Sequence, residues 1–244
     1  MSFVAALTSG LSNPARFMSV SRWLAPLLGA LAFAALLLGL MLGLQAPDDY
    51  QQGPTVKIMF IHVPAAIMSM AAYACVAGAS FFGLVFRHAL ADAAAKAAAP
   101  LGAAFTALAL VTGSLWGRPM WGTFWVWDAR LTSELVLLLL YIGYMALHAA
   151  MDDEQKGARA AAILALIGVV NLPIIHYSVV WWNSLHQGET VFAAGGSKAS
   201  PIYLAPLLLM MLGYLFLFAS LWLVRTRTEV WRRRAAAQAL RAAR

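Results

Sequence analysis

The sequence predicts an all-α, polytopic integral membrane protein with six transmembrane helices and with both termini in the cytoplasm. Hydrophobic residues make up 62% of the 244 residues and charged residues only 11%, whereas soluble domains carry roughly 25% charged residues. The sequence also holds six apolar runs of the length needed to cross a bilayer, roughly 20 residues. We therefore expect a single six-helix transmembrane domain over residues 1–244.

The six apolar runs are separated by more polar connections. They cover about residues 24–44, 58–86, 98–115, 131–150, 160–180 and 202–224. The first run is longer than the apolar core of a cleaved secretory signal, roughly 7–15 residues, so we expect it to remain as an anchor. Within the fifth run, Pro173 predicts a kink, because proline lacks a backbone N–H donor.

The distribution of lysine and arginine predicts the orientation. Thirteen of the 17 lie in the N-terminal segment, the second and fourth connections and the C-terminal tail. Such residues favour the cytoplasmic side, so the other three connections face outward, to the periplasm if the membrane is a bacterial inner membrane. The basic tail, residues 225–244, is expected to bind anionic lipid, with docking of a cytoplasmic partner as the alternative. This placement accounts for the net charge without nucleic acid.

Several kinds of chemistry are excluded by what the sequence lacks. The single cysteine, Cys75, cannot form an internal disulfide, and no CxxCH motif is present for covalent haem attachment. The sequence contains no P-loop, GxGxxG or HExxH motif. We therefore expect no enzyme activity in this chain, and any ATP hydrolysis would belong to a partner.

Tryptophan is concentrated in the expected outer connections. Residues 116–132 read WGRPMWGTFWVWDARLT and hold four tryptophans, and two more follow the fifth run. An aromatic belt at the interface is the bland explanation, but this clustering favours a flat shelf for a planar, apolar ligand. The tryptophans expected to form this periplasmic shelf are Trp116, Trp121, Trp125, Trp127, Trp181 and Trp182.

If Pro119 opens a short helix, Trp121, Trp125 and Asp128 share one face of it at i, i+4 and i+7. We expect such a helix to lie in the membrane surface, with one aromatic face toward lipid and the other toward the ligand.

Two histidines are expected at the same outer depth of the membrane. His62 lies near the start of the second run, and His186 lies in the third outer connection. Beside an aromatic shelf this pair is best explained as two axial ligands of a haem iron. His176, inside the fifth run, is left open between a third ligand and a neutral group that hydrogen-bonds between helices.

Arg118 and Arg130 lie on the side of the membrane where cations are scarce. Guanidinium groups bind carboxylates in a forked geometry, so these arginines are candidates for the two haem propionates. The simpler alternatives are that Arg130 forms an ion pair with Glu134, four residues later on the same helix, and that the Arg118 side chain extends its charged end to the membrane–water interface. Asp128 is expected to orient a neighbouring side chain of the site.

These observations favour a haem site at the outer lipid–water boundary, where a ligand can enter and leave. A membrane b-type cytochrome that exchanges electrons with quinol is the main alternative. A haem-free solute permease is less favoured, because mid-span polar residues are few (Thr106, Thr112 and Asn171) and permeases usually carry polar sites at the midplane.

The sequence resembles the WWD-motif haem-handling family of cytochrome c biogenesis, and most closely its short, six-helix haem-delivery branch. Three motifs carry the resemblance in order: IHVPAA around His62, WGRPMWGTFWVWDARLT, and WWNSLHQG around His186. The resemblance implies that His62 and His186 hold haem b on the periplasmic face of the inner membrane. It also implies delivery to a periplasmic haem chaperone (CcmE-like) and assembly with a small membrane subunit (CcmD-like) and ABC-transporter subunits (CcmA- and CcmB-like).

Overall fold

The structure is a computed structural model that describes residues 13–182, 184–186 and 200–243, and all regular elements in these ranges are helices. The elements are α2 (Pro14–Gln45), the 3₁₀ helix η1 (Pro54–Ile58), α3 (Met59–Phe86), α4 (Ala89–Trp121), α5 (Ala129–Ala150), α6 (Glu154–Gly168), α7 (Asn171–Trp181) and α8 (Pro201–Ala242).

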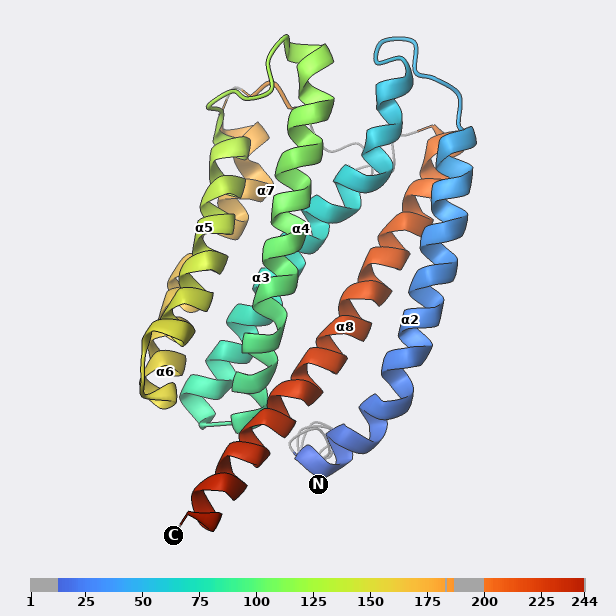
Figure 1. Ribbon diagram of the computed structural model, residues 1–244. Coiled ribbons are helices and arrows are strands. Elements are labelled where there is room, and N and C mark those ends of the chain that lie inside the picture. Colours follow the sequence, from blue (N-terminus) through green and yellow to red (C-terminus); the bar gives the residue numbers. More distant parts are fainter. Residues whose placement is uncertain (1–12, 183, 187–199, 244) are drawn as a thin grey trace, which may run out of the picture.

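Six helical segments of the described chain are long and apolar enough to cross a membrane, counting η1 with α3 and α6 with α7. The predicted all-helical, six-span membrane fold is confirmed. α2 packs along α8 and α3 along α4, while α5 pairs with α6 and α7. α2 begins and α8 ends at the same end of the bundle (Figure 1), as an even number of crossings requires.

α4 is longer than the apolar run that predicted it, and this changes the tryptophan stretch. The helix continues through Pro119 to Trp121 and ends at Gly122, whose φ of 76° is a left-handed conformation suited to glycine. The remaining residues up to Asp128 are not helical, and α5 begins at Ala129. The predicted surface helix opening at Pro119 is therefore wrong, because α4 does not stop at the apolar limit.

The fifth span is divided into two helices before it reaches its proline. α6 ends at Gly168, α7 begins at Asn171, and Pro173 lies in the first turn of α7, where no helical N–H is missed. The side chain of Asn171 donates to the backbone oxygen of Ser133 at 2.9 Å and so ties the break to α5. A two-residue turn, Val169 and Val170, thus separates the two helices about one turn before Pro173.

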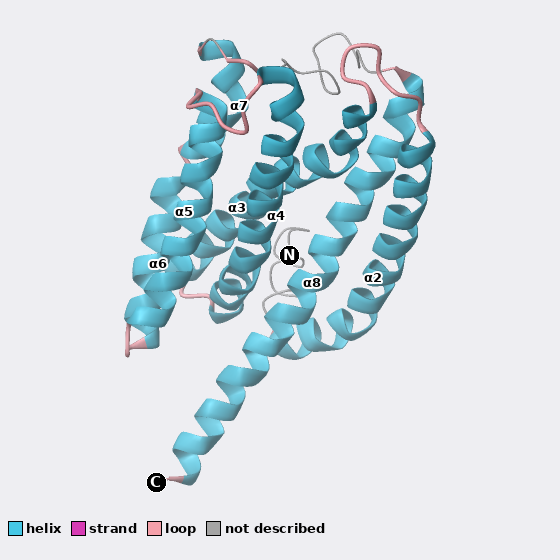
Figure 2. Ribbon diagram, turned by 45° about the horizontal axis from the view of Figure 1, so that its top comes forward, coloured by secondary structure: helices cyan, strands magenta, loops and turns pink. Residues whose placement is uncertain are grey.

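The basic tail continues α8 as a helix to Ala242, and its end extends beyond the bundle (Figures 1 and 2). Its first part is packed on protein carboxylates. Arg233 bonds Asp92 of α4 at 2.6 Å and Glu229 at 2.9 Å, and Arg232 pairs with Glu229 and Glu154. These two arginines, expected to bind lipid, instead join α8 to α4 and α6; Arg244 lies outside the described residues.

Candidate functional site

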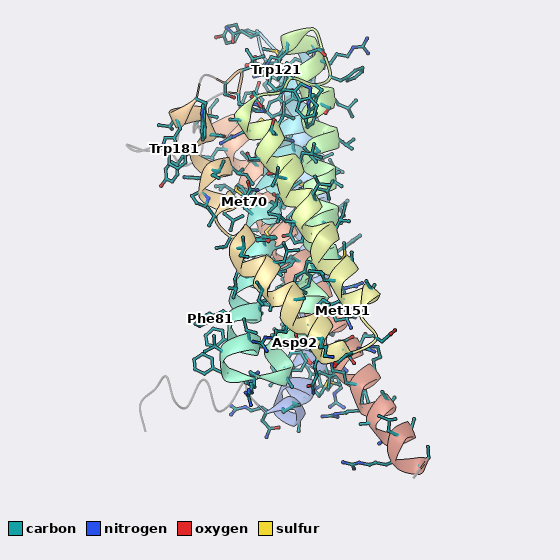
Figure 3. The ribbon with its side chains drawn as sticks, turned by 90° about the vertical axis from the view of Figure 1, so that its left-hand side faces the viewer. Met70, Phe81, Asp92, Trp121, Met151 and Trp181 are labelled. Atoms are coloured by element: carbon teal, nitrogen blue, oxygen red, sulfur yellow. The ribbon has the colours of Figure 1, made fainter. Side chains whose placement is uncertain are left out.

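A cavity of about 520 Å³ opens between α3, α4, α5 and α7 at the end of the bundle opposite the α8 tail. It extends from Trp121 at that end toward Met70, which lies between Trp121 and Asp92 along the bundle in Figure 3. Five of the residues predicted for the ligand site line this one cavity: His62, Trp116, Trp121, Arg130 and His186.

His62 lies at the second turn of α3 and is held by α4. Its Nδ1 is 3.0 Å from the backbone oxygen of Ala109 and 3.1 Å from Oγ1 of Thr112. A carbonyl only accepts, so Nδ1 carries the proton and Nε2 keeps its lone pair. Gly113 makes room for the ring, because a Cβ there would lie 2.9 Å from Cε1 of His62.

His186 is held by a carboxylate. Its Nδ1 is 2.7 Å from Oδ2 of Asp128, and its backbone N–H donates to Oγ of Ser184 at 3.1 Å. The contact with Asp128 directs the Nδ1 proton to the carboxylate and leaves Nε2 with the lone pair. Both histidines therefore share one arrangement, in which Nδ1 is anchored and Nε2 is available as a ligand.

Burial favours a neutral imidazole at His186, despite the neighbouring Asp128 carboxylate. Burial lowers the pKa of His186 from its ordinary value of 6.5, against the opposing effect of the Asp128 carboxylate. Burial alone would raise the pKa of Asp128, but hydrogen bonds from Ser184 and the Leu131 amide, with His186 nearby, hold that pKa below its usual value. At neutral pH the pair is a carboxylate beside a neutral histidine.

Two tryptophans border the histidines. The Trp116 ring meets His62 edge-on at 5.6 Å between centroids, and its Nε1 donates to Oε1 of Gln52 at 2.8 Å. The Trp121 ring meets His186 at 4.8 Å. Gly117 leaves space for Trp121, because a Cβ there would lie 2.5 Å from the indole. The aromatic wall of the cavity is thus built by the last two turns of α4.

The other four predicted tryptophans lie outside the cavity lining. Trp125 and Trp127 pack on each other at 5.4 Å, and Trp127 is 77% exposed. Trp181 and Trp182 also pack edge-on at 5.7 Å and stay about half exposed. The structure therefore divides the predicted shelf into two cavity indoles, three exposed indoles and the half-buried Trp125.

The two arginines are placed differently. Arg130 lines the cavity and donates to Oγ of Ser178 at 3.2 Å and to the carbonyls of Ile175 and His176 on α7. Arg118 lies outside the lining, with its guanidinium 4.4 Å from the centroid of Phe124. Of the two propionate candidates, only Arg130 faces the cavity.

Comparison with known proteins identifies the family. The family model CcmC, described as Heme exporter protein C, matches residues 7–241. The chain belongs to the CcmC family. It is 56% identical to the heme exporter protein C of Bradyrhizobium diazoefficiens over 224 residues, which cover 92% of this chain and 85% of the relative. The corresponding protein of Escherichia coli K12 is 53% identical over 90% of this chain and 89% of its own length.

Heme exporter protein C of Paracoccus denitrificans is a further relative, 46% identical over 93% of this chain and 94% of its own length. The matches extend over nearly the whole chain, so the resemblance to the haem-handling family of cytochrome c biogenesis is confirmed. As a CcmC-family protein with six apolar spans, the chain is a multi-pass membrane protein.

Sequence reasoning missed several residues that line this CcmC-family cavity or hold its side chains. Gln52, Thr112 and Ser184 hold Trp116, His62 and His186 by hydrogen bonds, and short polar side chains of this kind carry no distinctive pattern. The spacing of Gly113 and Gly117 was visible as GxxxG, a pattern that lets helices or large side chains approach closely. Glu134 also lines the cavity.

Proposed function

We propose that this protein is a haem-handling membrane subunit of cytochrome c biogenesis. It holds haem b, as cargo, at the periplasmic face of the bacterial inner membrane between His62 and His186, and passes it to a periplasmic haem chaperone of the CcmE kind. One observation carries the proposal. Two histidines from distant parts of the chain line one cavity, each with Nδ1 anchored to an acceptor and Nε2 left for iron.

The donor set suits a porphyrin-bound iron. Among the described residues, no group of three or more His, Cys, Asp or Glu side chains could hold a bare metal ion. A metal with only two protein ligands must bring the rest, and haem iron brings four nitrogens and takes axial histidine. The cavity volume of about 520 Å³ also lies within the range of roughly 300–1,000 Å³ usual for ligand sites.

The remaining walls suit the rest of the macrocycle. The indoles of Trp116 and Trp121 offer large apolar surfaces beside the two histidines. Arg130 supplies a cation for a propionate, and Asp128 positions His186 rather than contacting the ligand. Trp127, Trp181 and Trp182 are exposed at the same end, where indoles favour the membrane interface.

The relatives are named heme exporters, and this name supports action within an export complex. We propose the assembly that the family resemblance implies: a CcmD-like small subunit and CcmA- and CcmB-like ABC-transporter subunits that hydrolyse ATP. The chain itself acts by binding and transfer, without a catalytic residue of its own.

The test is haem binding by the purified full-length chain. Wild-type protein should show a haem Soret band, and a His62→Ala/His186→Ala double variant should lose it. His88→Asn is the matched control, because His88 caps the far end of α4 and asparagine also caps well. An unchanged spectrum in the double variant would sink the ligand assignment. Haem that cycles with quinol and never moves to a CcmE-like acceptor would favour the b-type cytochrome.

A further inference from the structure

A line of polar side chains runs through the bundle below the cavity. α3 contributes residues at i, i+4 and i+11, and α5 contributes residues at i, i+7, i+10 and i+14, so each set lies along one helix face. We call this set the polar column: Ser69, Tyr73, Ser80, Glu134, Tyr141, Tyr144 and His148. All of these side chains except His148 are buried, and the ring Nε2 of His148 is buried as well.

The upper end of the column is a carboxyl that can exist in two protonation states. Glu134 lines the cavity, and Oγ of Ser69 lies 2.7 Å from its Oε1 and also 2.7 Å from the backbone oxygen of Ala66. The single Ser69 proton can thus go to a Glu134 carboxylate, or turn to Ala66 and let a protonated Glu134 donate to Ser69. Both states are satisfied without moving the backbone.

The middle of the column is built from tyrosines. The Tyr141 hydroxyl donates to the backbone oxygen of Ser69 at 2.7 Å, and the Tyr73 ring meets Tyr141 edge-on at 5.0 Å. Glycines of two other helices make room for both hydroxyl ends. A Cβ at Gly102 would lie 2.1 Å from Tyr141 Oη, and one at Gly168 would lie 2.1 Å from Tyr73 Oη.

Unsatisfied polar atoms gather in this column. Among the described residues, four buried side-chain nitrogen or oxygen atoms lack a hydrogen-bond partner, and three belong to the column: Tyr73 Oη, Ser80 Oγ and His148 Nε2. Leaving such an atom unsatisfied costs about 1–3 kcal/mol, and ordered water is the usual partner of such groups. The clustering therefore indicates internal water along the column.

The lower end reaches the charged end of the bundle. At this end the Tyr144 and His148 rings are 5.0 Å apart. Asp92, Lys96, Glu229 and Arg233 act electrostatically on His148. The column thus extends from the cavity wall toward the ionic cluster at the end that we assign to the cytoplasm.

We propose that the polar column is a water-filled proton path between Glu134 and the cytoplasmic end of the bundle. A proton that enters at His148 displaces one from each following water or hydroxyl, so every intermediate group regains its proton and Glu134 changes from carboxylate to carboxylic acid. Release runs in reverse. Intramembrane ionisable groups commonly serve in such relays.

Through this path Glu134 can gain or lose a proton from the cytoplasmic end while a ligand occupies the cavity mouth. This role of the path rests on the proposed haem site. The charged or titratable groups that share the cavity with Glu134 are Arg130 on α5, His62 on α3, His176 on α7 and His186, and α4 contributes none to the lining. The path itself does not depend on haem.

The first experiment tests for water in haem-free, full-length protein in lipid nanodiscs. X-ray hydroxyl-radical footprinting modifies side chains that contact bound water. Tyr73 and Tyr144 should be labelled at least tenfold faster than Tyr214, a buried tyrosine of α8 packed on Phe105 outside the column. Equal, slow labelling of all three tyrosines would mean a dry column and would overturn the proposal.

The second experiment tests the direction of proton access with haem bound, which absorbance verifies separately. After a pH jump, time-resolved infrared spectroscopy follows the carboxyl band that Glu134→Gln removes. The rate should fall at least tenfold in Ser69→Ala and Tyr73→Phe, and stay unchanged in the matched Tyr214→Phe. Unchanged rates in the column variants would show that protons reach Glu134 through the cavity mouth and would overturn the path. If the protein shows no Soret band, the proposed haem site is wrong. The footprinting experiment still tests the polar column, because it uses haem-free protein.

Discussion

At the scale of single residues, Asp128 links the fold to the site. Its Oδ1 accepts from the Leu131 amide at 2.8 Å and so caps α5, while its Oδ2 accepts from Ser184 at 2.6 Å and faces His186 Nδ1 at 2.7 Å. One carboxylate therefore begins a helix and orients His186, the proposed ligand. The sequence indicated an orienting role for Asp128, but not which histidine it would hold.

Replacing Asp128 by asparagine should weaken haem binding by about 10–100-fold, the usual cost of losing a partner of a metal-bound histidine. Asparagine still caps α5, so the fold should persist. Haem titration followed at the Soret band measures the affinity. Asp48→Asn is the matched control, since Asp48 pairs with Lys57 at 3.1 Å outside the cavity lining. Equal affinities in the two variants would contradict the assigned role.

Haem affinity should also depend on pH with a definite sign. Burial lowers the pKa of His186 below 6.5, so the neutral ligand form predominates above pH 6.5 and is lost as pH falls through the lowered pKa. The Asp128 carboxylate raises the pKa of His186, so Asp128→Asn should move the midpoint to still lower pH. Soret titrations at a series of pH values check this; a midpoint above 6.5 would be inconsistent with it.

At the scale of elements, α4 decides the shape of the site. Its final turns place Gly113 against His62 and Gly117 against Trp121, with Trp116 beside His62. The apolar run predicted only the middle of this helix. Hydropathy reports which residues favour lipid, and it does not show where a helix continues beyond the lipid. The alanine-rich start and the Trp116–Trp121 end of the helix lie outside this apolar run. The tryptophan pattern alone could not reveal that only two indoles face the cavity.

Alanine at Gly113 or Gly117 should impair the site without unfolding the bundle. The added methyl group would lie 2.9 Å from the His62 ring or 2.5 Å from Trp121, so a ring must move. We expect haem affinity to fall by at least tenfold in each variant. Gly78→Ala on α3 is the matched control, because nothing lies within 4 Å of its Cβ; it should bind haem normally. Unchanged affinity at Gly113 and Gly117 would mean that neither ring position matters.

At the scale of the whole molecule, the two ends of the bundle have different chemistry. The cavity end holds histidines, indoles and Arg130, whereas the other end is tied by an ionic cluster in which Glu229 bonds Lys96 at 3.2 Å, Arg232 at 2.8 Å and Arg233 at 2.9 Å. This cluster joins the long helix α8 to α4, and Arg232 extends it to Glu154 at the start of α6.

Glu229→Gln should destabilise the protein, because three cations would lose their shared carboxylate. We expect about 1–3 kcal/mol, between the values for exposed and buried ion pairs, and so a Tm lower by roughly 2–4 °C per kcal/mol. Thermal unfolding in detergent provides the measurement. Lys156→Gln is the control: it removes an exposed ion pair with Asp153 and should change Tm little. A Glu229→Gln variant that unfolds with the wild-type Tm would show that the ionic cluster does not stabilise the bundle.

The sequence predicted the number of spans and the pairing of His62 with His186 in one region, because both depend on long apolar runs and on unusual side chains. It did not predict the polar column. Tyrosine and serine hardly interrupt an apolar run, so Ser69, Tyr73 and Tyr141 are inconspicuous until the helices are brought together. Residues 183 and 187–199 of the third outer connection lie outside the described residues.

The break between α6 and α7 has a consequence for biosynthesis. α6 has 15 residues and α7 has 11, and each is shorter than the roughly 17 residues that a helix needs to cross a bilayer alone. The insertion machinery must therefore accept the two pieces as one hydrophobic segment, beside α5. Because Asn171 bonds the backbone oxygen of Ser133 on α5, we expect the break to form only once this segment and α5 lie side by side in the membrane.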